Sequence, residues 1–515
     1  MRRISKIGVY LGVAALFVLF VITRFWRVAT IPVGVNVDEA GMAYDAWCLA
    51  FYGVDRYLQS WPLYLTNYGG GQSVLYAYLC AALFRIFDYH IVLARLPAIL
   101  FSLLTLLFGM AAARKLWPGR RAPVLLTGLL ITVCPYFIMA GRVGLDCNLM
   151  LGASAVFLVC FTQALQKNRT GLYVLAGVAG GILLYSYALS YVILPLFLAV
   201  MFGYALRTRQ FHLKGWLWMA LPLGILAFPL ILVQLVNLLG LPQMQLGIFT
   251  VTRLPEYRAG EITGFCAENF RLLLKSIFVG DHLVYNSAPG FANLYGISVV
   301  FFGVGLVHIS IQMIRSVRQR KFQAFAVWTA WFWSVFLMGA IRGTCVNRIN
   351  GIFLCYALFA VDGMILLMDL LKSVTARRVA AGSVGIAYLI LFVNFGRYYY
   401  GGGYSAECYP AYFMDITVEG AVDYLESHPE IQHKGAYLTQ PEIYFALSIL
   451  RSPYELRLYE EGDVFFEYYD CNTLGAIDAD YDYIVTNVYP EFAEELRQAG
   501  FAEVEFTGYS LFFME

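Results

Sequence analysis

The chain has 515 residues, of which 60% are hydrophobic and only 14% are charged. Soluble domains carry about 25% charged residues, so this composition excludes a soluble enzyme, a disordered chain and a nucleic-acid binder with a basic surface. The net charge of +2 is a cancellation, because residues 1–397 hold 32 of the 36 lysines and arginines, whereas residues 398–515 hold 22 of the 34 acids. We therefore expect a membrane body over 1–397 and an acidic soluble domain over 398–515.

Apolar segments of about 17–25 residues predict eleven transmembrane helices, because that length crosses the ~30 Å hydrocarbon core. These segments are 7–23, 91–113, 122–140, 149–166, 171–188, 191–207, 216–238, 294–314, 323–341, 350–371 and 379–396. The shorter apolar run 73–87 predicts a helix that lies at the membrane interface.

Basic residues orient the helices. Every second connection is basic, and together these connections hold 19 lysines and arginines and no acid: 1–6, 114–121, 167–170, 207–215, 315–322 and 372–378. The positive-inside rule places them in the cytoplasm, together with the N-terminus. An odd number of spans then puts the loops 24–90 and 239–293 and the tail 398–515 outside the cell.

The tail alternates helical and strand-like patterns, which predicts a small extracytoplasmic α/β domain. The expected helices are 415–427 and 490–499, and the expected strands are 481–488 and 501–513. The Tyr-Tyr-Tyr-Gly-Gly-Gly segment 398–403 is the expected hinge. Cys408 and Cys471 can pair if the tail is outside the cell.

The acids of the membrane body gather on the expected outer side, where ten of the twelve lie. The other two, Asp362 and Asp369, lie toward the inner end of the tenth span. We therefore expect no mid-bilayer proton relay of the kind that a proton-coupled transporter needs.

Three outer segments carry residues suited to chemistry. Asp38 and Glu39 open the first loop, where adjacent carboxylates can deprotonate an acceptor hydroxyl, bind a divalent cation or form an ordinary solvated turn. Arg142 and Asp146 lie in a tight turn, where they can pair and cap helices or join the acids and an anionic ligand. The outer-side arginines suit phosphate binding or contact with lipid headgroups: Arg95, Arg342 and Arg348.

The loop 239–293 is longer than a connection requires, which predicts a lid, an acceptor-binding element or an interfacial aromatic belt. Within it we single out Tyr257 and Arg258 as candidate pocket residues. The run Gly69 to Ser73, which includes Gln72, lacks the spacing of a phosphate-binding P-loop and predicts a flexible turn that lets backbone approach a ligand.

The order of these features resembles the GT-C superfamily of membrane glycosyltransferases, of the bacterial protein O-mannosyltransferase and aminoarabinose-transferase type. The resemblance covers residues 1–400. The matching positions are Asp38, Glu39, Tyr44, the run Ala94-Arg95-Leu96-Pro97, Arg142 and Asp146.

The resemblance implies a plasma-membrane enzyme of a bacterium that transfers a sugar, with inversion, from a polyprenyl-phosphate donor to an extracytoplasmic glycan, lipid or protein. It implies Asp38 as the base, with Glu39 and Asp146 shaping the same pocket and Arg95, Arg142, Arg342 or Arg348 holding the phosphate. Tyr44, Gln72, Tyr257 and Arg258 are further pocket candidates.

The resemblance is incomplete at one point, because Gly71-Gln72-Ser73 stands where aminoarabinose transferases carry a Lys-Pro-Pro-type motif with a phosphate-binding lysine. We therefore leave the sugar open. We expect no cofactor and no nucleic-acid partner, and we lean against a divalent metal. The alternative functions are a lipid or glycan transporter or flippase, and a non-catalytic scaffold for envelope assembly.

Overall fold

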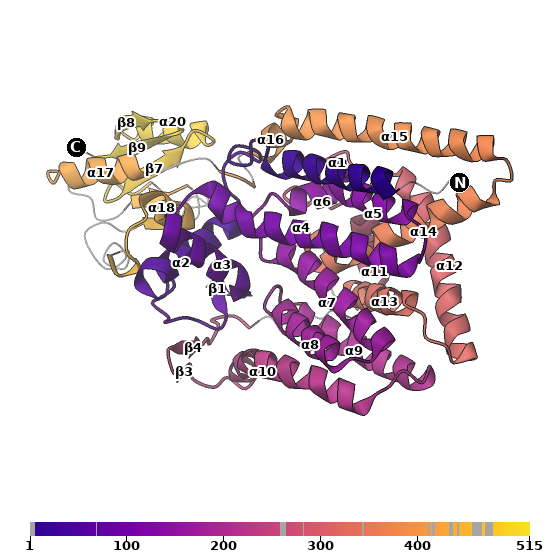
Figure 1. Cartoon of the computed structure of the whole chain (residues 1–515). Helices are drawn as coiled ribbons and strands as arrows, with labels where there is room; N and C mark the ends of the chain where they lie inside the picture. Colours follow the sequence, from indigo (N-terminus) through magenta and orange to yellow (C-terminus); the bar gives the residue numbers. More distant parts are fainter. Residues whose placement is uncertain are drawn as a thin grey trace.

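The computed structural model describes residues 6–67, 70–257, 264–281, 283–341, 344–409, 412–414, 418–431, 436–439, 442–455, 466–468 and 477–514. Most of the chain up to Tyr400 forms a bundle of long helices, and strands and short helices gather near the C-terminus (Figure 1).

Among the described residues, eight helical segments are long and apolar enough to cross a membrane. They are α1 (Lys6–Phe25), α4 (Ile91–Leu116), α7 (Cys147–Lys167), α9 (Ser190–Arg207), α10 (Leu213–Leu238), α12 (Ile297–Gln319), the 3-10 helix η2 (Val346–Ile352) continued by α14 (Phe353–Leu370), and α15 (Val374–Tyr400). Each coincides with one of the expected spans, so the polytopic helical architecture is confirmed.

The remaining three expected spans fall on shorter apolar helices, so a count of eleven stays a prediction. These helices are α5 (Ala122–Val133) followed by α6 (Pro135–Ala140), α8 (Thr170–Leu184) and α13 (Phe325–Ile341). The break between α5 and α6 lies at Cys134, whose backbone is extended. A residue before proline is disfavoured in helical geometry, so Pro135 explains the break.

The helices differ in how deeply they lie in the bundle. In the most apolar 18-residue stretch of α7, 89% of the residues are buried, whereas in that of α15 only 11% are buried. Helix α7 packs against α4 and α8, and α15 runs along an edge of the bundle (Figure 1). The apolar outer face of α15 is therefore available to lipid.

The expected first outer loop folds into two helices and a hairpin at one end of the bundle, which we call the loop end. These elements are α2 (Val37–Tyr52), β1 (Leu65–Asn67), β2 (Gly70–Gln72) and α3 (Val74–Phe87). The strands are antiparallel, with Leu65 opposite Gln72 and Asn67 opposite Gly70. The run that includes Gln72 is thus a hairpin strand and not only a turn.

The second expected outer loop contains a two-stranded hairpin and an amphipathic helix. These elements are β3 (Met244–Leu246), β4 (Phe249–Val251) and α11 (Ala267–Phe278). Helix α11 buries Leu273 and Ile277 and exposes Arg271 and Lys275, in agreement with helical spacing of its apolar residues.

The described residues of the C-terminal region form a mixed sheet of five strands in the order β6-β5-β7-β9-β8. Its strands are β5 (Ala436–Leu438), β6 (Phe466–Tyr468), β7 (Asp482–Thr486), β8 (Ala502–Phe506) and β9 (Tyr509–Phe513), and its helices are α16 (Gly403–Cys408), α17 (Glu419–Ser427), α18 (Glu442–Ile449) and α20 (Pro490–Gln498). The expected strand 501–513 is a hairpin of β8 and β9, turning at Gly508 with φ of 91°. Cys408 is buried and Cys471 lies outside the described residues, so their pairing stays a prediction.

The C-terminal region docks on the first loop. Val35 and Met414 exchange two backbone hydrogen bonds of 3.0 Å each, and the Asn36 side chain donates to the Tyr412 carbonyl over 2.9 Å. The apolar side of α18 packs against α2 (Figure 1). The segment just before α2 is therefore held from both sides, by the bundle and by the C-terminal region.

Candidate active site

Asp38 lies in the first turn of α2, where the sequence Asn36-Val37-Asp38-Glu39 begins the helix. The Asn36 side chain accepts from the Asp38 amide, and Glu39 accepts from the Asn36 amide, which together form a capping box. Asp38 is half-buried, and its Oδ1 accepts a 2.8 Å hydrogen bond from the side-chain amide of Asn67 on β1. The carboxylate is thus held at a helix N-terminus, where negative charge is favoured.

The orientation of Asn67 is set by a chain of polar side chains. Arg56 Nη2 donates to Asn67 Oδ1 over 3.1 Å and lies 3.1 Å from Asp45 Oδ2. Because Arg56 only donates, the Asn67 oxygen must face it and the Asn67 amide nitrogen must face Asp38. A Cβ added at Gly41 would lie 2.9 Å from Arg56 Nη2, so glycine on α2 leaves the space that the guanidinium fills.

Asp45 and Asp55 form the buried base of this chain. Burial raises the pKa of Asp45, and the charge of Arg56 opposes that rise. Burial, followed by the nearby charge of Asp45, raises the pKa of Asp55 to about 7. The charge of Arg56 therefore opposes the rise in pKa of both carboxyl groups, and its guanidinium orients the Asn67 amide.

Glu39 has an environment very different from that of Asp38. It is 1% exposed, and its two oxygens bind Arg95 in a fork, with Nε–Oε1 at 2.9 Å and Nη2–Oε2 at 3.0 Å. The same carboxylate accepts from the backbone amides of Gly144, over 2.8 Å, and Asn36. A Cβ at Gly144 would lie 2.8 Å from Glu39 Oε1, so the turn can close on the carboxylate only with glycine.

The structure gives Arg95 and Arg142 a different environment from the predicted phosphate site. Arg95 is fully buried, and besides Glu39 it donates to the carbonyls of Val28, Pro32 and Gly34. Such a guanidinium has no donor left for a ligand, because its five N–H groups are used within the protein.

Arg142 is also fully buried and binds four backbone carbonyls over 2.8 to 3.1 Å, those of Thr23, Arg24, Trp26 and Ile31. Its guanidinium lies over the rings of Tyr399 and Tyr400, 5.6 and 5.1 Å from their centroids. It does not pair with Asp146 in any described contact. Arg142 therefore joins the ends of α1 and α15 and does not face a ligand.

Asp146 immediately precedes α7 and caps it. Its Oδ1 accepts from the Cys147 amide over 2.6 Å, and its Oδ2 accepts from the Ser73 amide, at the start of α3, over 3.1 Å. Burial raises its pKa to about 7; the Ser73 amide opposes the rise and the charge of Asp38 adds to it. Asp146 thus caps a helix, which is one of the two alternatives that the sequence left open. The charge of Asp38 also raises the pKa of the same carboxyl group.

Two tyrosines and Arg348 complete the cluster. Burial raises the pKa of Tyr285, in the loop before α12, and the charge of Asp38 raises it further. Tyr187 lies between α8 and α9, and Arg348 lies on η2, whose Asn350 side chain donates to the carbonyl of Cys147, the residue after Asp146. Separate segments thus bring carboxyl groups, phenols and a half-buried guanidinium together at the loop end.

The other predicted pocket residues are dispersed. Tyr44 is fully buried and donates to the Arg451 carbonyl over 2.9 Å, so it joins α2 to the C-terminal region. Gln72 is buried next to Ser73, and its Oε1 has no hydrogen-bond partner among the described residues. Tyr257 donates to Gln234 over 2.7 Å. Arg258 and Arg342 lie outside the described residues.

Sequence reasoning did not single out Asn67, Tyr187 or Tyr285. The available sequence signal for Asn67 was its place between a strand-like segment and the glycine run, a pattern that is typical of a hairpin turn. No group of three or more His, Cys, Asp or Glu side chains gathers as a metal site within the part of the chain that the structure describes.

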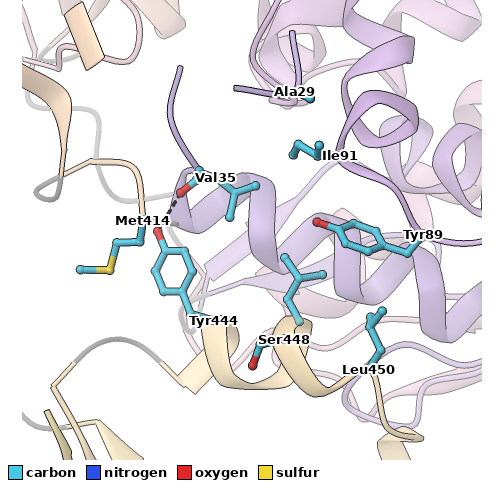
Figure 2. Close-up of a pocket in the computed structure, with 10 residues that line it drawn as sticks. Ala29, Val35, Tyr89, Ile91, Met414, Tyr444, Ser448 and Leu450 are labelled. Atoms are coloured by element: carbon cyan, nitrogen blue, oxygen red, sulfur yellow. Dashed lines mark hydrogen bonds between the residues drawn. The ribbon is translucent and has the colours of Figure 1, made fainter. Parts of the chain in front are cut away.

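A cavity of about 220 Å³ lies apart from this cluster, between the first loop, the start of α4 and α18. Figure 2 shows the Tyr444 hydroxyl directed at the Val35 carbonyl, with Tyr89 and Ile91 across the space. None of the predicted site residues that the structure describes lines the cavity. It therefore belongs to the junction between the first loop and the C-terminal region.

Comparison with known proteins identifies the fold. Residues 72–233 match the protein family described as dolichyl-phosphate-mannose-protein mannosyltransferase. No curated protein matches the chain by sequence. Among solved structures, the chain is similar to ArnT from Cupriavidus metallidurans in the apo state, with 14% identity and a TM-score of 0.54 over 98% of this chain and 97% of that one.

Two further structures contain lipid phosphates. ArnT from Cupriavidus metallidurans bound to undecaprenyl phosphate has 13% identity and a TM-score of 0.52, over 99% of this chain and 98% of that one. The oligosaccharyltransferase AglB from Archaeoglobus fulgidus, in complex with an inhibitory peptide and a dolichol-phosphate, has 12% identity and a TM-score of 0.53, over 99% and 74%. The resemblance to GT-C membrane glycosyltransferases is thereby confirmed, and the chain is a multi-helix membrane protein with their fold.

Proposed function

We propose that the protein transfers a sugar from a polyprenyl-phosphate donor to a hydroxyl group of an extracytoplasmic glycan, lipid or protein. The observation that carries the proposal is the position of the Asp38 carboxylate. It is held by a hydrogen bond from Asn67, and its charge raises the pKa of both Asp146 and Tyr285. The fold shared with proteins solved with undecaprenyl phosphate and dolichol-phosphate supports the donor class.

In the proposed reaction, the acceptor oxygen attacks the anomeric carbon while its proton passes to Asp38. The bond between that carbon and the phosphate oxygen breaks, and polyprenyl phosphate leaves with the electron pair. Attack opposite the leaving group inverts the anomeric centre. The leaving group is already a good one, so the protein has to supply mainly a base and positive charge near the phosphate.

We assign the positive charge to Arg348, because it is half-buried on η2, whose Asn350 side chain donates to the carbonyl of Cys147, the residue after Asp146. Arg342 precedes η2 in the chain and remains a second candidate. Glu39, Arg95 and Arg142 are positioning residues in this proposal, since their hydrogen bonds are made within the protein. No resident metal is needed, and we expect activity to survive a chelator.

The test uses purified full-length protein in nanodiscs with polyprenyl-phosphate sugars and envelope extract. Asp38→Asn should lower sugar transfer by about 10²–10⁴-fold, the usual contribution of a general base. Asp88→Asn is the matched control, because Asp88 is an exposed carboxylate of the same loop. Equal transfer by Asp38→Asn and the wild type would refute the assignment, whereas absence of transfer by both is the result that a non-catalytic scaffold predicts.

One observation favours transport as a second candidate function. His308 Nδ1 in α12 lies 2.6 Å from Asp362 Oδ2 in α14, and Gln312 and Trp117 also bind this pair. The expectation that the body lacks a mid-bilayer proton relay stays a prediction, because these contacts form a single pair that joins α12 to α14. A transporter or flippase requires this pair, so loss of lipid or glycan movement in Asp362→Asn, with intact sugar transfer, would identify it.

The orientation follows from the basic connections and is tested at Cys266. This cysteine precedes α11 and is exposed, whereas Cys408 is buried. We propose that the N-terminus is cytoplasmic and the C-terminal region is outside the plasma membrane of a bacterium. In a Cys471→Ser background, a membrane-impermeant maleimide should label Cys266 in intact cells and should fail when Cys266→Ser is added; labelling only after lysis would reverse the orientation.

A further inference from the structure

The hairpin of β3 and β4 exposes apolar side chains that a water-facing hairpin would not. All three residues of β3 are exposed, and so are Leu239, Leu241, Ile248 and Phe249. The segment 239–252 contains no charged residue. Exposed strands of soluble proteins are normally protected by charge or proline on the edge, and here only Pro242 serves that purpose.

The apolar surface of this hairpin continues the lipid-facing side of α10. That helix exposes a stripe of apolar residues at helical spacing: Leu217, Leu221, Ile225, Phe228, Ile231, Leu235 and Leu238. The hairpin begins six residues after the end of the helix and lies at its loop end (Figure 1). This continuity with a membrane span favours contact with lipid, whereas an isolated apolar patch would favour contact with another protein.

The hairpin is anchored to α10 and does not swing freely. The Asn237 side chain donates to the Thr252 carbonyl over 2.9 Å, and its oxygen accepts from the Leu254 amide over 2.7 Å. These bonds tie the end after β4 to the last turn of the span, and the Leu241 amide ties the end before β3 by donating to the Val236 carbonyl over 2.9 Å. The apolar residues at its tip are held at a defined distance beyond α10.

The other side of the hairpin is bound to the first loop. Thr250 donates its amide to the Ser60 carbonyl over 2.9 Å and accepts at its own carbonyl from the Leu63 amide over 2.9 Å. The Thr252 hydroxyl donates to the Tyr64 carbonyl over 2.6 Å. The segment that continues into β1 and Asn67 thus rests on the hairpin.

We propose that residues 239–252 form a membrane-inserted wedge, whose apolar tip lies in the interfacial layer of the lipid bilayer and seats the first loop on the membrane. The occupant of the exposed face is lipid, because the face is uncharged and continuous with the lipid-facing stripe of α10. The proposal stands independently of the reaction proposed above.

The test is the accessibility of a spin label at Ile248, introduced through an encoded ketone amino acid in the full-length protein. The protein is placed in nanodiscs of phosphatidylethanolamine and phosphatidylglycerol. Labels at Ile225, on the lipid-facing stripe, and at Gln498, exposed on α20, serve as the lipid and water references. The readout is the ratio of collision rates with oxygen and with a water-soluble nickel chelate.

We expect the ratio at Ile248 to be nearer to that at Ile225 than to that at Gln498. A ratio nearer to that at Gln498 would overturn the proposal, because the tip would then face water. Low collision rates with both reagents would also overturn it, since a protein surface, either a second copy or an acceptor protein, would then cover the tip.

Discussion

Replacing Glu39 by glutamine should destabilise the protein strongly, although the change is nearly isosteric. The variant leaves the Arg95 guanidinium fully buried without a counter-charge, beside backbone carbonyls and a neutral side-chain amide. It also turns an amide N–H toward one of three donors that Glu39 now accepts: Arg95, Gly144 or Asn36. Removing one partner of a buried ion pair costs about 3–5 kcal/mol, and we expect Glu39→Gln to fall in that range.

The assay is equilibrium unfolding of the full-length protein in mixed micelles, followed by tryptophan fluorescence. Glu268→Gln is the matched control, because Glu268 also binds an arginine in a fork, Arg271, but both side chains are largely exposed. We expect the control to unfold with the wild type, since an exposed pair contributes little. Coincident unfolding curves for Glu39→Gln and Glu268→Gln would refute the reasoning.

Three further predictions concern the cluster. Gly41→Ala should reduce sugar transfer, because its Cβ would displace Arg56 and thereby release Asn67. Gly171→Ala, at a helical position with open space, is the control and should leave the rate unchanged. Equal rates for the two variants would show that the contacts of Arg56 and Asn67 have no role in transfer. Arg348→Ala should raise the KM for the polyprenyl-phosphate donor more than that for the acceptor, and the reverse split would move Arg348 to the acceptor side. Asp146, with its pKa raised from 3.8 to about 7, binds a proton in the folded state that it loses when unfolded, so its contribution to stability should fall as pH rises between those values. Unfolding midpoints of the wild type should therefore decline more from pH 5 to 8 than those of Asp146→Asn. An equal decline in the two proteins would show that Asp146 is not the source of the pH dependence.

Apolar segment length and the distribution of charge were sufficient to predict the helical body. A span must satisfy its backbone internally and match the hydrocarbon thickness, and both demands are local properties of sequence. For that reason the helices α4, α7, α10 and α15 occur where they were expected. The C-terminal helix α20 was equally readable, because Pro490 and Glu491 are typical of a helix start.

The family resemblance was also available from local order along the chain, since it rests on which residues follow which span. Sequence order placed Asp38 at the opening of the first outer loop and Asp146 in the tight turn between two spans, and the structure adds that Asp38 lies in the first turn of α2. Their mutual influence required two loops, more than 100 residues apart, to meet at the loop end.

Tertiary structure alone decided the surroundings of each charged residue. Arg95, Arg142 and Arg348 are equivalent in sequence as basic residues on one side of a membrane body. In the folded chain, carbonyls from distant backbone such as Val28 and Thr23 occupy the first two, whereas Arg348 stays half-buried in the cluster. A carbonyl is present at every residue and carries no sequence signal, so only the fold shows which ones lack a local partner and take up a guanidinium.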